Sequence, residues 1–209
     1  MILTASFSGK PEIGKMHGTT LSSVSSLTVN PEPIVQFNIQ VPSATSKSIQ
    51  DNKYLALHIL KPSNDSVRLA RNFSLGSRYI NEPQPETRNT NNSSEIKSTT
   101  PFERIDKDQW SLFENVMHNK RPGSIRLDSD LHLPILTKDS ERILICQKYK
   151  VFKVYNHEIW TCKVKEILVN IDDDVKTGGL LYFDRKFHHV GEALIEVKKD
   201  EKEIQKLET

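Results

Sequence analysis

The chain has 209 residues, of which 36% are hydrophobic, enough to build a packed core without disulfides or metals. Its 29 Lys and Arg residues nearly balance its 27 Asp and Glu residues, giving a formal net charge of +2. This balance gives no electrostatic reason to expect a nucleic-acid partner or an anionic membrane surface. The longest apolar runs are only a few residues, so we expect no membrane-spanning helix.

The two cysteines, Cys146 and Cys162, are too few for a disulfide framework or a four-cysteine zinc site. Both lie in strand-like runs, which favours two buried reduced thiols over a bridge between them. The histidines are scattered, and the adjacent His188 and His189 would point to opposite faces of a strand. We therefore predict no metal site.

The first residues contain neither the basic segment nor the sustained apolar segment of a secretory signal. We therefore expect an intracellular protein, mitochondrial or cytoplasmic, that is not secreted.

Apolar residues alternate with polar ones, or form short runs, in several segments that we predict as strands. The clearest is 34–40, where Val35, Phe37 and Ile39 would face the core while polar side chains face away. Shorter or more uniform runs predict further strands over residues 2–7, 54–60, 131–136, 142–149 and 159–169. Many short strands with turn signals between them predict a β-barrel or sandwich with accessory helices.

Helical spacing is limited to two segments. Residues 63–75 begin with a suitable N-cap, Ser63, and residues 112–117 form a shorter candidate. Residues 81–100 contain a single apolar side chain, and we predict a mobile surface loop inserted into the domain. The Lys/Glu-rich residues 191–209 predict a charged helix or tail that follows a domain over residues 1–190.

Two clusters of hydroxyl residues flank the 34–40 strand, one over residues 19–23 and one over residues 43–46. Hydroxyl and turn N–H groups donate hydrogen bonds to phosphate oxygens, so the two clusters can converge on one anionic ligand. Lys47 would supply part of the balancing charge. Ser/Thr stretches are also common in ordinary loops, and composition alone favours that interpretation. The sequence has no G-x-G-x-x-G, Walker A or G-x-S-x-G motif, which argues against a Rossmann nucleotide site, a P-loop and a serine hydrolase.

The order of the motifs is more informative than any one of them. Residues 18–39 contain Gly-x-Thr-x-Ser-Ser, a Ser-rich strand, x-Pro-x-Pro and an alternating strand, and residues 42–45 add Ser-x-Thr. This series resembles the opening of the flavin reductase-like family of FMN-binding split barrels. Later segments resemble the family in the same order, over residues 54–60, 69–73, 133–136, 156–160 and 179–187. The resemblance implies a mainly β fold with accessory helices, a Greek-key-like split β-barrel over residues 1–190.

The resemblance also implies a flavin site, with FMN as the cofactor, FAD as the alternative and NAD(P)H as co-substrate. Three hydroxyl residues would line the isoalloxazine ring and ribityl chain: Thr20, Ser22 and Ser23. Three further residues would hold the phosphate: Ser43, Thr45 and Lys47.

By the same resemblance, His157 would be the catalytic residue beside the nicotinamide, and Arg185 would lie at the rim of the flavin. The alternative for His157 is a strand-end histidine that makes one ordinary hydrogen bond. The alternative for Arg185 is a surface ion pair with Asp184 or Glu158. The chain departs from the family pattern at three positions: Val24 replaces the usual Phe, and residues 155–156 replace Gly-Asp before His157. Flavin binding is therefore better supported than catalysis.

The leading hypothesis is an NAD(P)H-dependent flavin oxidoreductase. The resemblance implies a homodimer, supported by apolar faces over residues 35–39 and 160–164 that one small barrel would leave incompletely covered. The alternative is a split barrel, with or without flavin, that serves as a non-catalytic interaction or assembly module. The altered residues before His157, the long insertion and the charged tail favour that alternative. The sequence leaves open the choice between NADH and NADPH and the identity of the electron acceptor.

Overall fold

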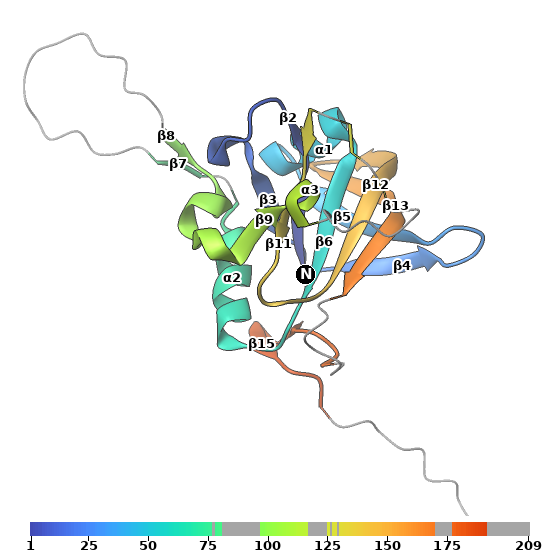
Figure 1. Ribbon diagram of the computed structural model, residues 1–209. Coiled ribbons are helices and arrows are strands. Elements are labelled where there is room, and N and C mark those ends of the chain that lie inside the picture. Colours follow the sequence, from blue (N-terminus) through green and yellow to red (C-terminus); the bar gives the residue numbers. More distant parts are fainter. Residues whose placement is uncertain are drawn as a thin grey trace, which may run out of the picture.

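The computed structural model describes residues 1–76, 78–80, 97–116, 125, 127–128, 130–169 and 177–191 (Figure 1). Its main element is a seven-stranded antiparallel sheet in the order β3-β1-β6-β12-β13-β5-β4. The strands are β1 (Ile2–Ala5), β3 (His17–Thr20), β4 (Val24–Thr28), β5 (Ile34–Gln40), β6 (Tyr54–Leu60), β12 (Ser140–Val154) and β13 (His157–Val169).

The two edges of this sheet are consecutive in the chain. Strands β3 and β4 occupy opposite ends of the strand order, yet only residues 21–23 connect them. Three residues span roughly 14 Å at most, so the sheet must curl until its edges approach each other. No ladder joins β3 to β4 among the described strands, so the curl does not close. The predicted mainly β split barrel is confirmed.

In the described part of the chain, four two-stranded ribbons and three helices surround the sheet. The ribbons pair β2 (Phe7–Ser8) with β10 (Leu131–His132), β9 (Trp110–Leu112) with β11 (Pro134–Leu136), β7 (Arg78–Ile80) with β8 (Lys97–Thr99), and β14 (Leu181–Phe183) with β15 (Lys186–His188). The helices are α1 (Ala44–Asn52), α2 (Asn64–Ser74) and the single turn α3 (Phe113–Val116). Short 3-10 turns are η1 (Ile13–Lys15), η2 (Pro101–Arg104) and η3 (Lys107–Gln109).

Helix α2 begins where the sequence predicts, because the Ser63 hydroxyl accepts a hydrogen bond from the Ser66 N–H at 3.0 Å. Helix α1 was not predicted. Its only buried apolar residue is Ile49, so the segment has no apolar helical period for sequence reasoning to detect. It forms because Ser43 caps its start and Lys53, with φ 68°, ends it in the left-handed region.

Three sequence predictions need correction. The predicted loop over 81–100 is too long, because residues 97–99 form β8 and Thr100 is buried as the cap of η2; residues 81–96 lie outside the described residues. The helix predicted over 112–117 starts later, since Leu112 belongs to β9, which pairs with β11. The single strand predicted over 131–136 divides into β10 and β11, which pair with different partners.

The predicted core alternation in β5 is confirmed, because Val35, Phe37 and Ile39 are all buried inside the curled sheet. The ring of Phe37 stacks on that of Trp160 with centroids 6.4 Å apart. Cys146 and Cys162 are buried there as free thiols, as expected. Burial raises the pKa of both thiols, that of Cys162 to about 12, so neither ionises near neutral pH.

A second core cluster lies under α2 and contains Phe73 and Phe102, whose rings meet edge to face. On the same face of β6 as Ala56 and Leu60, His58 is completely buried. Its Nδ1 lies 3.1 Å from the Ile2 carbonyl oxygen, and its Nε2 accepts the Leu136 N–H at 3.0 Å. The proton therefore sits on Nδ1, and the neutral ring ties β1, β6 and β11 together. Burial lowers the pKa of His58 to about 4.

Candidate functional site

Three hollows meet around the end of β3 and form one groove. The α1 hollow, about 750 Å³, lies at the start of α1, and the β3 hollow, about 310 Å³, adjoins it. The hairpin hollow, about 350 Å³, lies beyond, next to the β14–β15 hairpin. The α1 and β3 hollows share Thr19, Gln40 and Ser43. The β3 and hairpin hollows share Thr20, Leu21 and Ser22.

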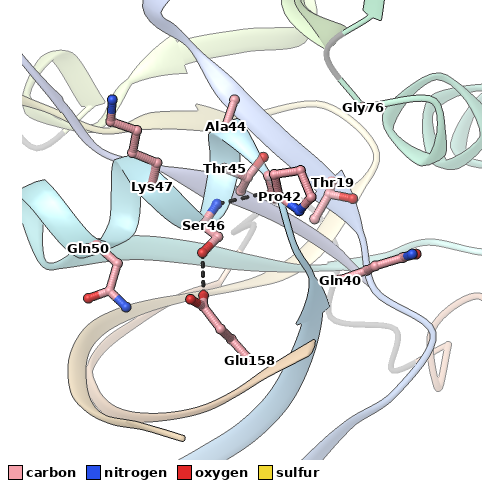
Figure 2. Close-up of a pocket in the computed structure, with 11 residues that line it drawn as sticks. Thr19, Gln40, Pro42, Ala44, Thr45, Ser46, Lys47, Gln50, Gly76 and Glu158 are labelled. Atoms are coloured by element: carbon pink, nitrogen blue, oxygen red, sulfur yellow. Dashed lines mark hydrogen bonds between the residues drawn. The ribbon is translucent and has the colours of Figure 1, made fainter. Parts of the chain in front are cut away.

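The α1 hollow is built around the first turn of a helix (Figure 2). Ser43 is the N-cap, and its hydroxyl accepts the Ser46 N–H at 3.2 Å. The N–H groups of Ala44 and Thr45 have no acceptor inside the helix and take part in none of the described hydrogen bonds. Such free N–H groups, together with the helix dipole, make a helix start a binding place for phosphate or another anion.

One positive and one negative side chain line the α1 hollow. Lys47 is exposed, and Glu158 lies under the helix start, where its carboxylate accepts a hydrogen bond from the Ser46 hydroxyl. Lys47 extends away from Glu158 in Figure 2, and the described ion pairs do not join them. Attraction of an anion therefore depends mainly on the backbone donors, because the two side-chain charges offset each other.

The β3 hollow is lined by hydroxyl, amide and imidazole groups. Thr20 borders it, but its hydroxyl already donates to the Ala70 carbonyl of α2 at 2.6 Å. His157 begins β13 and is half-buried, with Nδ1 2.9 Å from the side-chain oxygen of Asn156. The contact with Asn156 is what we expect of a strand-end histidine that makes one ordinary hydrogen bond. The position of His157 in the lining of the hollow is what we expect of a catalytic residue. The catalytic role stays a prediction.

Gly18 allows β3 to lie close to its neighbours. A Cβ atom at this position would come within 2.6 Å of the Phe73 ring and 2.7 Å of the Leu3 carbonyl oxygen. Only glycine fits between β1 and α2 here, so the Gly of the Gly-x-Thr-x-Ser-Ser motif lets β3 pack against both elements.

Arg185 borders the hairpin hollow from the two-residue turn of the β14–β15 hairpin. Asp184 and Arg185 both have positive φ, 47° and 60°, as a tight hairpin turn of this kind requires. The ion pair proposed as an alternative is not observed, because none of the described ion pairs joins Arg185 to Asp184 or Glu158.

The structure brings most of the predicted site residues to this groove. Those that line it are Thr20, Ser22, Ser43, Thr45, Lys47, His157 and Arg185. Ser23 is exposed and lines none of the three hollows. Sequence reasoning missed Gln40, Ser46, Glu158 and Arg71, which also line it. Of these, only Ser46 carried a signal, as a member of the 43–46 hydroxyl cluster.

Within the described ranges, no three His, Cys, Asp or Glu side chains gather closely enough to hold a metal ion. No helix in that part of the chain is both long and apolar enough to cross a membrane.

The fold and groove define a split barrel whose groove runs past the start of helix α1. Residues 1–191 match the flavin reductase like domain, and the chain belongs to this family. The family associates the chain with a flavin and a nicotinamide nucleotide.

Solved structures share the fold at low sequence identity. A flavin reductase domain protein from Arthrobacter sp. FB24 is 22% identical, with a TM-score of 0.58 over 94% of this chain and 89% of that one. Flavin reductase HpaC, solved with NADP+, is 19% identical, with a TM-score of 0.56 over 90% and 87% of the two chains. The styrene monooxygenase flavin reductase of Pseudomonas putida S12 is 16% identical, with a TM-score of 0.55 over 92% and 90%.

Proposed function

We propose that the chain binds FMN in the groove and reduces it with NAD(P)H. The observation that carries the proposal is the α1 hollow, where the Ala44 and Thr45 N–H groups face no acceptor in the helix. These two donors, the Ser43 and Thr45 hydroxyls and the Lys47 ammonium fit the terminal phosphate of FMN. When bound, FMN supplies the two-electron chemistry that no side chain of this chain can provide.

The β3 hollow is the place we propose for the flavin ring, because it opens directly from the phosphate end. Thr20, Ser22, Asn38 and His157 are among the residues that line it. His157 would orient the nicotinamide against the ring, and Arg185 would close the far rim. We retain FMN over FAD because one phosphate suffices to engage the donors at the start of α1.

A visible absorption spectrum of the purified chain tests the proposal. We expect added FMN to shift and sharpen its absorption bands on binding, and NADPH or NADH then to bleach them. Binding without bleaching would leave a flavin carrier. Failure to bind FMN, FAD or riboflavin would overturn the proposal and leave the interaction module.

We also propose that the chain works as a homodimer, as its family resemblance implies. The faces over residues 35–39 and 160–164 do not support this, because their apolar side chains fill the core. Support comes instead from exposed apolar side chains on the long β12–β13 hairpin: Tyr149, Phe152, Val154, Tyr155, Ile167 and Val169. Sedimentation as a monomer at micromolar concentration would contradict the dimer. The intracellular location, mitochondrial or cytoplasmic, stays a prediction for cell fractionation.

A further inference from the structure

Three parts of the fold that are distant in sequence wall the hairpin hollow, and Met1 and Leu60 also line it. Helix α2 contributes Arg71 and Ser74, and the β14–β15 hairpin contributes Tyr182, Arg185 and Phe187. The end of β3 and the link that follows it form the third wall, which the β3 hollow shares. Figure 1 shows the hairpin beside α2 and the end of β6. At about 350 Å³, the hollow lies within the range of small-molecule sites, about 300–1,000 Å³.

The hairpin is held in place over this hollow. The Leu180 N–H donates to the Leu60 carbonyl at the end of β6, at 2.8 Å. Gly179, which precedes Leu180 and has φ 81°, lies close to the Ile59 side chain of β6. Phe187 packs against the core cluster under α2, and its ring meets that of Tyr182 with centroids 5.0 Å apart. The wall that carries Arg185 is therefore anchored to the barrel.

The chemistry of the hollow combines positive charge with aromatic surface. Arg71 and Arg185 are both exposed, and neither forms an ion pair among the described residues. None of the described residues that line the hollow is acidic, in contrast to the α1 hollow with Glu158. Guanidinium groups bind phosphate oxygens in bidentate fashion, and aromatic rings such as Tyr182 offer a face to a planar base. The hollow thus suits a nucleotide that carries a phosphate dianion.

The position of the hollow indicates which nucleotide. The assignment of a nucleotide to this hollow rests on the proposed function, in which the FMN phosphate occupies the α1 hollow and the ring occupies the β3 hollow. The hairpin hollow then lies past the ring, on the side away from the FMN phosphate, and remains for the second ligand. We propose that it holds the adenosine 2′-phosphate end of NADPH, with Arg71 and Arg185 on that phosphate, and that the chain prefers NADPH to NADH.

Calorimetry with adenosine 2′,5′-bisphosphate and with adenosine 5′-monophosphate tests the inference without any turnover. We expect the bisphosphate to bind the parent chain at least tenfold more tightly, since hydrogen bonds to charged groups are the strong ones. Arg71→Met and Arg185→Met should each weaken the bisphosphate about tenfold or more and leave the monophosphate nearly unchanged. Arg68→Met is the matched control, because Arg68 lies on the same helix but pairs with Asp65 away from the groove.

Steady-state kinetics give a second readout. The Arg71→Met variant should raise KM for NADPH about tenfold while KM for NADH changes little, and thermal melting should confirm that it folds. Equal binding of the two nucleotides to the parent chain, or unchanged bisphosphate binding in both arginine variants, would overturn the inference. Failure of the proposed function would appear separately, as loss of FMN binding in a chain that still discriminates the two adenosine probes.

Discussion

The two ends of the groove attract anions by different means. At the α1 end, free backbone N–H groups face the cleft, and the one lysine is offset by Glu158. At the hairpin end, two arginines stand beside aromatic rings with no acidic side chain in the lining. Helix dipoles act through secondary structure and reach only the first turn, whereas exposed guanidinium charges act at longer range and are screened by salt. Changes at α1 should therefore act through backbone and hydroxyl donors, and changes at the hairpin through charge.

The largest expected effect is at the α1 end. Replacing Ser43 and Thr45 together with alanine should weaken FMN by about a hundredfold or more, because each lost hydrogen bond to a charged group costs roughly 1.5–3 kcal/mol. Riboflavin, which has no phosphate, should bind nearly as before. Titration of both flavins measures the difference.

The double variant also loses the helix cap, so its control must lose a cap elsewhere. Ser63→Ala removes the equivalent cap of α2, which accepts the Ser66 N–H at 3.0 Å, and should cost a similar 0.5–2 kcal/mol or so of stability. FMN affinity should survive in Ser63→Ala. Equal losses for FMN and riboflavin in the double variant would place the phosphate somewhere else.

The second prediction concerns the barrel that supports both ends. The pKa of His58 is lowered from 6.5 to about 4 by burial, so between these values the unfolded chain binds more protons than the native one. The free energy of unfolding should therefore fall as pH drops from 6.5 towards 4, by about 3 kcal/mol in total from this group. Urea titrations at several pH values measure it. His58→Gln should flatten this part of the profile, and an unchanged profile in that variant would refute the assignment.

A smaller effect isolates a single backbone donor. Ala44→Pro removes one free N–H at the first position of α1, where proline is tolerated. The preceding Ser43, with φ −145° and ψ 128°, already has the extended conformation that proline requires of its neighbour. We expect FMN to bind about tenfold more weakly, with riboflavin affinity and the melting temperature nearly unchanged. If FMN affinity also stayed the same, the helix start would not be the phosphate site.

The smallest effect tests the charge balance at the α1 end. Glu158→Gln keeps a hydrogen-bond acceptor for the Ser46 hydroxyl but removes the negative charge from the hollow. FMN affinity should rise about two- to fivefold at low salt and return towards the parent value as salt is added, because the two charges are partly exposed to solvent. Riboflavin serves as the control and should not respond. A decrease in FMN affinity would mean that Glu158 positions Ser46 for the phosphate.

Much of the fold could be predicted from the sequence, because the signals are local. Alternation in β5 follows from side chains pointing to opposite faces of a strand, and the start of α2 follows from the capping hydroxyl of Ser63. The Gly-x-Thr-x-Ser-Ser segment likewise indicated hydroxyl side chains next to a ligand. The motifs that follow it in order indicated the family. The structure adds the reason for the glycine at position 18, because β1, β3 and α2 lie too close together there for a side chain.

Other features depended on the folded structure, because they arise between segments far apart in the chain. Helix α1 has no apolar residues at helical spacing, so the sequence pattern does not predict it. Its free N–H groups line a hollow only because the fold places the start of the helix there. Glu158 meets Ser46 across 112 positions because β13 pairs with β5 directly before α1. Arg71 and Arg185 line one hollow because the anchored β14–β15 hairpin lies beside α2. No local sequence pattern predicts these contacts, because the pairing of strands and the packing of elements bring the side chains together.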